Sequence, residues 1–206
     1  PPAQGEMYEN PVAQTPIALF DANNNPTGIQ MIRERHTPNP EIEVDYFANS
    51  LSQMTLQYPN GQTEQITLGG PTRVNVMIPS NGLAADVDGD GLDQVSTEMV
   101  QLELTGNSSV GPVMVGLDPS RSTLGQIEED VNTTPGTLDL PPFTSGGTAS
   151  SFFDVFFTVM IGTGTYHTAS PAHMQARITH KPPAQGEMYE SSQVLELLNQ
   201  NNNPTG

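Results

Sequence analysis

The sequence predicts an all-β protein built as an antiparallel β-sandwich. Short runs of alternating apolar and polar residues recur along the chain, as in 42–47 and 73–78. Turn-forming residues separate these runs, and the 206 residues include 19 Gly and 19 Pro. Helical spacing is confined to one short segment. Closely spaced strands with turns between them are typical of sandwiches.

The expected strands follow in chain order. Residues 16–20 and 29–32 form a first pair around the turn-forming segment 21–28. Further strands are expected at 42–47, 54–58, 66–68, 73–78, 99–104, 113–117, 152–161 and 174–180. The run 152–161 is apolar on both faces, so we expect a central strand there. An Ig-like or a jelly-roll-like sandwich accommodates this pattern.

One short helical excursion is expected at 122–131, where Leu124, Ile127 and Val131 have helical spacing. The acids at 128–130 could be a catalytic pair or a solvated helix face. Adjacent acids point to different sides of a helix and do not flank a scissile bond as glycosidases require. The solvated face is the favoured interpretation.

The chain repeats its own beginning. Residues 182–190 match 1–9 letter for letter, and Asn-Asn-Asn-Pro-Thr-Gly occurs at 23–28 and again at 201–206. The first block recurs 181 residues later and the last block 178 residues later, so the second copy is three residues shorter. This predicts a repeat unit at 1–181, a connector at 181–190, and the first strand of a next unit within 191–206. The alternative is a duplicated tail inside one closed domain.

The two copies also predict how units join. Alternate positions stay apolar between them, since Ile17 and Leu19 align with Leu195 and Leu197. We expect the strand 194–198 to pair with the sheet of an adjacent unit by β-strand addition. Deleting 182–206 would then leave a unit that does not polymerise. The residues assigned to assembly are Ile17, Leu19, Phe20, Val194, Leu195, Leu197 and Leu198.

Composition excludes several classes of protein. The formal charge is −17 with only six Lys and Arg, which argues against nucleic-acid binding and against docking on anionic membranes. No apolar run is long enough to span a bilayer. The chain has no Cys, which excludes disulfides, thiolate zinc sites and cysteine nucleophiles. Any targeting signal was cleaved or lies before Pro1.

The segment 86–93, Asp-Val-Asp-Gly-Asp-Gly-Leu-Asp, carries the sharpest local motif. Aspartates at positions 1, 3 and 5 with Gly at position 6 resemble the calcium loops of dockerins, thrombospondin type 3 repeats and EF-hands. The expected Ca²⁺ ligands are Asp86, Asp88, Asp90 and the Leu92 carbonyl, with Asp93 or Glu98 completing the shell. Position 12 is Thr97, which departs from the EF-hand pattern. The alternative is an acidic solvated turn.

Two Asn-x-Ser/Thr tripeptides predict exposed N-glycosylation sites at Asn107 and Asn132. The Thr/Ser-rich runs 144–151 and 162–170 could carry O-linked sugar. The four His residues show no metal-ligand spacing on a helix, and no nucleophile stands beside a base. The chain is therefore not expected to be an enzyme.

These features predict a structural repeat unit of an extracellular bacterial filament or giant surface protein, stiffened by Ca²⁺. The chain resembles the broad class of long acidic tandem-domain surface proteins with dockerin-like calcium loops. Its expected partners are copies of itself and, as a further candidate, glycan. The alternative is a carbohydrate-binding or adhesin module, although such modules stack sugars on aromatic rings and this chain has no Trp.

Overall fold

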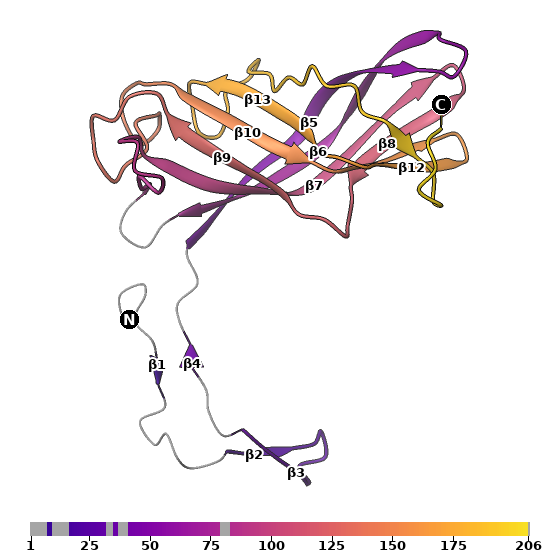
Figure 1. Ribbon diagram of the computed structural model, residues 1–206. Helices are drawn as coiled ribbons and strands as arrows, with labels where there is room; N and C mark the ends of the chain where they lie inside the picture. Colours follow the sequence, from indigo (N-terminus) through magenta and orange to yellow (C-terminus); the bar gives the residue numbers. More distant parts are fainter. Residues whose placement is uncertain (1–7, 10–16, 32–34, 37–40, 79–82, 206) are drawn as a thin grey trace. The chain divides into compact units, whose positions relative to one another are not determined.

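The computed structural model describes residues 8–9, 17–31, 35–36, 41–78 and 83–205 (Figure 1). The chain divides into two compact units, Pro1–Glu41 and Ile42–Gly206. The repeated segment lies in the second unit together with the strands before it, and the repeat unit expected at 1–181 stays a prediction. Within the described residues, no helix is long and apolar enough to cross a membrane.

The first unit contains two short antiparallel pairs. Strand β1 (Tyr8–Glu9) pairs with β4 (Arg35–His36), and β2 (Ile17–Phe20) pairs with β3 (Pro26–Met31). The second pair confirms the hairpin expected around 21–28. The side chains of Ile17, Leu19 and Phe20, assigned to assembly, lie outside the described part of the structure.

The second unit is one ten-stranded sheet with antiparallel pairs. Its strands are β5 (Glu41–Gln57), β6 (Thr63–Ile78), β7 (Gln94–Ser108), β8 (Gly111–Leu117), β9 (Thr123–Glu129), β10 (Ala149–Val155), β11 (Phe157–Ile161), β12 (Gly164–Thr168), β13 (Ala172–Ile178) and β14 (Leu197–Leu198). The all-β class and the antiparallel sheet are thereby confirmed.

The long strand β7 divides the sheet into two branches. One edge of β7 pairs with β6, while its other edge pairs with β9 through residues 94–99 and with β8 through residues 103–108. One branch continues β9–β10–β13, and the other continues β8–β11–β12–β14. Apolar side chains from both branches, including Val115 of β8 and Phe153 of β10, belong to one buried cluster.

The helical excursion expected at 122–131 is wrong. Residues 123–129 form β9, which pairs with β7 on one side and β10 on the other. Of the three residues with helical spacing, Ile127 is buried whereas Leu124 and Val131 are exposed. Gly125 lets β10 approach closely, since a Cβ there would lie 2.1 Å from the Phe152 carbonyl oxygen. Pairing on both edges therefore outweighs a weak helical pattern.

The strand expected at 152–161 is interrupted at Phe156. Its two halves are β10 and β11, which belong to different branches of the sheet. Each half lies between two neighbours, β10 between β9 and β13, and β11 between β8 and β12. The apolar character of both faces thus correctly predicted central positions, although the chain crosses between branches midway.

Candidate functional site

The aspartate loop lies between β6 and β7. Carboxylate oxygens of Asp86, Asp88 and Asp90 come within 4.8 Å of one another, and all three residues are exposed. The Gly89 N–H donates to Asp86 Oδ1 at 2.7 Å, and the Gly91 N–H donates to Asp86 Oδ2 at 3.0 Å. Both glycines have positive φ, 82° and 95°, which explains why glycine occupies these positions.

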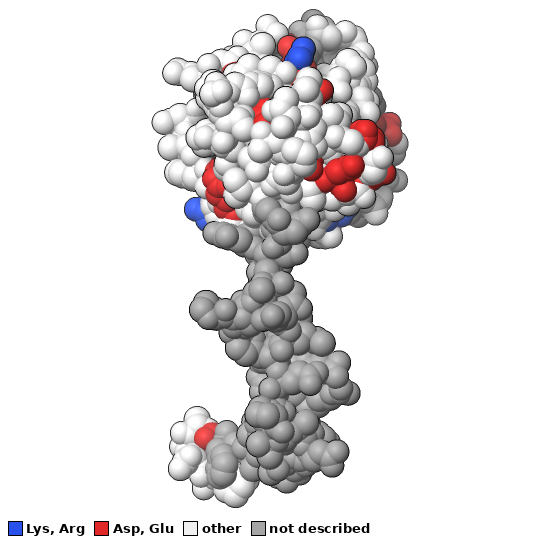
Figure 2. Space-filling view, turned by 90° about the vertical axis from the view of Figure 1, so that its left-hand side faces the viewer, with Lys and Arg blue, Asp and Glu red and all other residues white. Residues whose placement is uncertain are grey.

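This loop concentrates negative charge, and no basic side chain in the described part of the structure forms an ion pair with it. Among the described residues of the second unit, the basic side chains that form ion pairs contact other carboxylates; they are Arg121, His173, Arg177 and Lys181. Figure 2 shows acidic side chains in several groups on one face of the molecule, and few basic ones. Converging carboxylate oxygens are what Ca²⁺ prefers as ligands, so the loop fits a cation.

The other predicted ligands lie outside this cluster. Asp93 is buried, its carboxylate accepts a hydrogen bond from the Gly136 N–H, and it does not join the three aspartates. Glu98 also lies outside the cluster, on β7 between Asn75 and Leu124. The Leu92 N–H donates to Asp90 Oδ1 at 2.9 Å, which fixes that residue at the end of the loop. Because β7 begins beside it, the chain directs Asp93 inward.

Glu128 faces the loop and was not predicted as part of the site. Glu128 belongs to β9, where it pairs with Gln94 of β7. Burial raises the pKa of Glu128 above its ordinary value, and the charges of Asp90, Asp88 and Asp86 raise it further. An interpretation of 123–129 as a strand would have identified it, since that places Glu128 and Glu129 on opposite faces.

Three buried carboxylates lie at the base of the loop, those of Asp93, Glu129 and Asp139. Glu129 accepts hydrogen bonds from the backbone N–H groups of Asp93 (3.0 Å) and Asp139 (2.7 Å). Burial raises the pKa of Glu129 in spite of these bonds. Burial also opposes ionisation of Asp139, but hydrogen bonds from Thr133 and Thr134 outweigh it and hold its pKa below the ordinary value. These contacts tie the start of β7 to the segment 132–140.

The two predicted glycosylation sites differ in environment. Asn107 is exposed near the end of β7, as expected. Asn132 is only half exposed, and its amide Nδ2 donates to the Gly91 carbonyl at 3.1 Å. Its Oδ1 is buried without a partner. The expected exposure of Asn132 is therefore wrong, because its amide is used to hold the aspartate loop.

The repeated segment 182–190 is fastened to the sheet of the same unit. Glu187 accepts hydrogen bonds from the N–H and hydroxyl of Thr179, both at 2.6 Å. The Tyr189 ring packs 5.5 Å from the Phe153 ring, and its hydroxyl donates to Ser151 Oγ at 2.9 Å. Burial raises the pKa of Tyr189 to about 12.

The segment continues along two open sheet edges, drawn in yellow in Figure 1. Glu190 exchanges two backbone hydrogen bonds with Gln175 of β13, at 2.9 and 3.0 Å. Of the strand expected at 194–198, only Leu197–Leu198 pairs, as β14, with His167 and Thr168 of β12. Leu195 and Leu197 are half-buried, whereas Val194 is 91% exposed.

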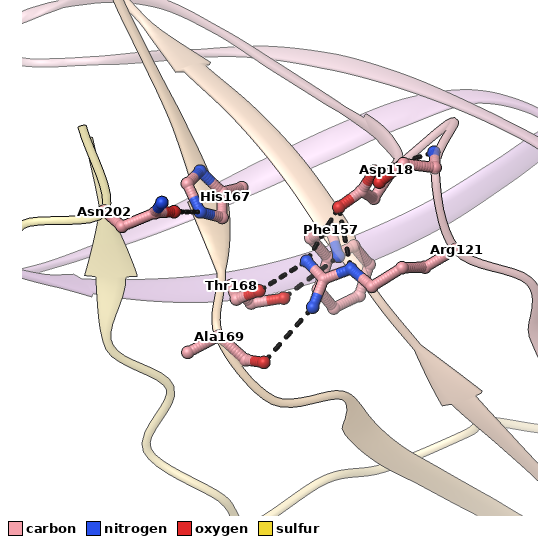
Figure 3. Close-up of polar contacts among 8 residues, drawn as sticks. Asp118, Arg121, Phe157, His167, Thr168, Ala169 and Asn202 are labelled. Carbon is pink, nitrogen blue, oxygen red and sulfur yellow. Dashed lines mark hydrogen bonds and ion pairs between the residues drawn. The ribbon is translucent and has the colours of Figure 1, made fainter. Parts of the chain in front are cut away.

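The turn after β14 adds one side-chain contact. Asn202 Oδ1 lies 2.9 Å from His167 Nε2 (Figure 3). Beside it, Arg121 binds Asp118 and donates to the carbonyls of Thr168 and Ala169, which holds the end of β12 in place. The hydroxyl and N–H of Ser120, together with Arg121, lower the pKa of Asp118 to about 2. Arg121 thus holds in place the end of β12, the strand with which β14 pairs.

A groove of about 2340 Å³ lies within the second unit. It is lined by β5, by the two branches and by the segment 183–197, and most of the apolar side chains that face it belong to the core or pack against it. Its walls include Met54 of β5, Leu102 of β7, Phe153 of β10, Val159 of β11 and Leu197 of β14. The repeated segment therefore forms one wall of the groove.

Comparisons with known proteins bear on the fold. No family model matches the sequence, and no curated protein matches it. Among solved structures, the chain is similar to DynF from the dynemicin biosynthesis pathway of Micromonospora chersina, with a TM-score of 0.60 and 20% identity. The match covers 82% of this chain and 74% of DynF. At this identity the likeness concerns the fold alone.

Proposed function

We propose that this protein is a structural repeat unit of an extracellular bacterial filament or giant surface protein, stiffened by Ca²⁺ and joined through its repeated segment. The observation that carries the proposal is that the residues which contact the sheet are the same residues that are repeated in the sequence. Glu187, Tyr189 and Glu190, which fasten the segment to the sheet, all belong to the block repeated letter for letter. A unit that has these residues at both ends could be fastened to the next unit through the same contacts.

The sandwich form belongs to the same proposal. The two branches that leave β7 would face each other across the shared core, as the layers of a sandwich do. The segment 182–198 would bridge their outer edges, since it contacts both β13 and β12. Bridging covers backbone groups that would otherwise invite unwanted pairing.

Calcium would stiffen the loop at the start of β7. Asp86, Asp88 and Asp90 supply converging oxygens, and an exposed site of this kind fits the weak affinities of extracellular modules, about 10⁻⁴–10⁻³ M. Neutralising the loop would also relieve its repulsion of Glu128. Asn132 and the buried carboxylates would transmit this stiffening to the segment 132–140.

Calcium removal tests this role. Calcium at about 100 times its dissociation constant should stabilise the fold by about 2.7 kcal/mol, and a chelator should reverse the rise in melting temperature. The double change Asp88→Ala, Asp90→Ala should abolish the response. Glu98→Gln is the matched control, because Glu98 lies outside the cluster. A response that survives the double change would rule out this site.

The alternative is a binding module, and the groove is the observation that favours it. Its apolar walls suit an apolar ligand better than a sugar, because sugars need exposed aromatic rings. Of the tyrosines in the second unit, Tyr46 is exposed, and Arg73 lies over its ring. Titration with an apolar fluorophore separates the alternatives: saturable binding that Met54→Glu abolishes would favour a binding module.

Glycosylation of Asn107 would suit either function, and measurement of the intact mass of the protein would detect it.

A further inference from the structure

We propose that residues 1–31 are a docking element for a second copy of this chain, and that the chain's own tail, residues 182–206, controls assembly by occupying the docking site first. This inference rests on the proposed function and specifies its partner and its regulation. The site consists of the open edges of β13 and β12. Its occupant in this structure is a near-duplicate of the N-terminal segment.

The first argument is that the two copies share their contact residues. Within the tail, the side chains of Glu187 and Tyr189 and the backbone of Glu190 make the contacts with Thr179, Ser151 and Gln175. The equivalent residues of the first copy are Glu6, Tyr8 and Glu9, identical in type. In the divergent stretch 191–196, the Gln193 side-chain oxygen accepts a hydrogen bond from the His173 N–H at 2.8 Å. The residues that contact the β13 side of the site, Glu187, Tyr189 and Glu190, are therefore identical in the two copies.

The second argument is that both copies fold the same turn. In the tail, Asn199 and Asn203 close the turn with a 2.9 Å backbone bond, and Asn202 has φ 58°. In the first copy, Asp21 and Asn25 close it with a 2.9 Å bond, and Asn24 has φ 65°.

The side chain at the start of each turn acts in the same way. Asn199 Oδ1 accepts from two following N–H groups at 2.9 and 3.1 Å, and Asp21 Oδ1 does so at 2.9 and 2.8 Å. In both copies the residue before the turn pairs with the proline after it. The hairpin in the first copy thus already has the conformation that is docked on β12 in the second.

The third argument concerns competition. The tail is tethered next to its site, at an effective concentration of about 1 mM for a short connection. A second copy at micromolar concentration cannot displace an equivalent tethered segment, so the intact chain should be monomeric. Loss of the tail should then promote assembly, which is the reverse of the outcome that the sequence predicts for deletion of 182–206. Docking would also open the two-residue pairing of β1 with β4. Once the tail is weakened, the edges of β13 and β12 become free to take the first copy from another chain.

The symmetry of this contact determines what kind of assembly forms. The docking element precedes residue 42, and the site lies on strands that end at residue 178. One molecule therefore offers an element to a different surface on the next molecule. Such a contact is heterologous, and it propagates as a filament unless it closes into a ring.

Weakening the tail tests the proposal in the full chain. The change Tyr189→Ala, Leu197→Asp should convert a monomer into oligomers at micromolar concentration, as measured by light scattering after gel filtration. Adding Tyr8→Ala, Leu19→Asp should restore the monomer, because it damages the donor. Oligomers that persist after the second pair of changes, or a tail variant that stays monomeric, would overturn the proposal.

A disulfide identifies the register. The chain has no Cys, so any disulfide is an introduced one. Phe20 is equivalent to Leu198, which lies opposite His167. In the weakened-tail background, Phe20→Cys with His167→Cys should form a disulfide between molecules, whereas Leu19→Cys with His167→Cys should not. Adjacent strand residues point to opposite faces. Equal cross-linking in both variants would contradict docking at β12.

A peptide of residues 1–31 separates this inference from the proposed function. It should bind the weakened-tail variant, checked as folded by circular dichroism, and Tyr8→Ala in the peptide should weaken binding tenfold or more. If the tail variant loses thermal stability but ignores the peptide, the tail still holds its own unit, and only assembly between chains is refuted. If the variant loses no stability, the proposed role of the segment fails as well.

Discussion

Lys181 is a buried basic residue at the point where the repeated segment begins. Its side chain is 1% exposed, and its Nζ lies 3.2 Å from an Asp45 carboxylate oxygen and 2.9 Å from a Glu43 carboxylate oxygen, both on β5. Burial raises the pKa of Asp45, and the charge of Lys181 opposes that rise. A charge buried in this way is tolerated only with its partner in place. The pair therefore fixes the start of the tail against β5.

We expect Lys181→Met to destabilise the fold by about 3–5 kcal/mol at neutral pH, since Asp45 would remain buried without its cation. The unpaired Asp45 would have a raised pKa, so the loss should shrink as pH falls through that pKa. Denaturant unfolding measures both effects. Arg177→Met is the control, because that pair is exposed and should cost less than about 1 kcal/mol. Adding Asp45→Asn should recover part of the loss; no recovery would contradict this account.

We expect Glu128 to make the calcium affinity of the aspartate loop depend on pH. Burial raises the pKa of Glu128, the three aspartates raise it further, and a bound Ca²⁺ would neutralise the aspartates and lower it again. Calcium binding should therefore release protons, and affinity should rise as pH increases through the raised pKa of Glu128. Calorimetric titration across the acidic range measures this dependence. Glu128→Gln should flatten it, and an unchanged slope would show that Glu128 is not coupled to the loop.

At the scale of elements, pairing along the edges of each strand determines the structure where the local sequence pattern is ambiguous. Strand β9 has neighbours on both sides and Gly125 at its closest approach to β10. The chain likewise changes branch at Phe156, over whose ring the Arg121 guanidinium carbon lies 4.0 Å from the centroid. These positions depend on strands far away in sequence, and no period in the local sequence encodes them.

The substitution Gly125→Ala distinguishes the strand at 123–129 from the helix that the sequence predicted there. In the strand, the new Cβ would collide with the Phe152 carbonyl, so we expect a loss of about 1–3 kcal/mol. In a helix, the same change would stabilise by about 1 kcal/mol. Thermal unfolding decides the sign. Gly146→Ala is the matched control, because nothing lies within 4 Å of its added Cβ. Stabilisation by Gly125→Ala would contradict the strand.

At the scale of the whole molecule, the core belongs to one unit. Among the side chains that the structure describes, the buried cluster and the residues packed against it run from Met54 to Leu197, so it includes part of the tail. The tail is therefore part of the core of the second unit, and we expect this unit to fold alone.

A fragment of residues 42–206 should unfold cooperatively, with the melting temperature and calcium response of the full chain. A fragment of residues 42–181 should melt at lower temperature, because it loses Tyr189 and Leu197 from the core and exposes two sheet edges. Circular dichroism on the two fragments measures the difference. Equal melting temperatures would show that the tail contributes nothing to the fold.

The sequence by itself determined the all-β class, the aspartate cluster and the repeated segment. Each depends on residues close together in the chain: a period of two, an Asp-x-Asp-x-Asp spacing, or direct identity. The alternation was strong enough to locate most strands before any neighbour was known. Exposure of Asn107 could be predicted from the turn-forming residues around it.

Only the tertiary structure decided which groups meet. Asn132 binds Gly91 across 41 residues, Glu128 approaches the aspartates from another strand, and the tail pairs with β12 of its own unit. Each contact is set by sheet order and register, which minimise the free energy of the whole assembly of strands. A local pattern encodes the face of a strand and leaves its neighbour unspecified, because hydrogen bonds between strands form through backbone groups that every residue carries.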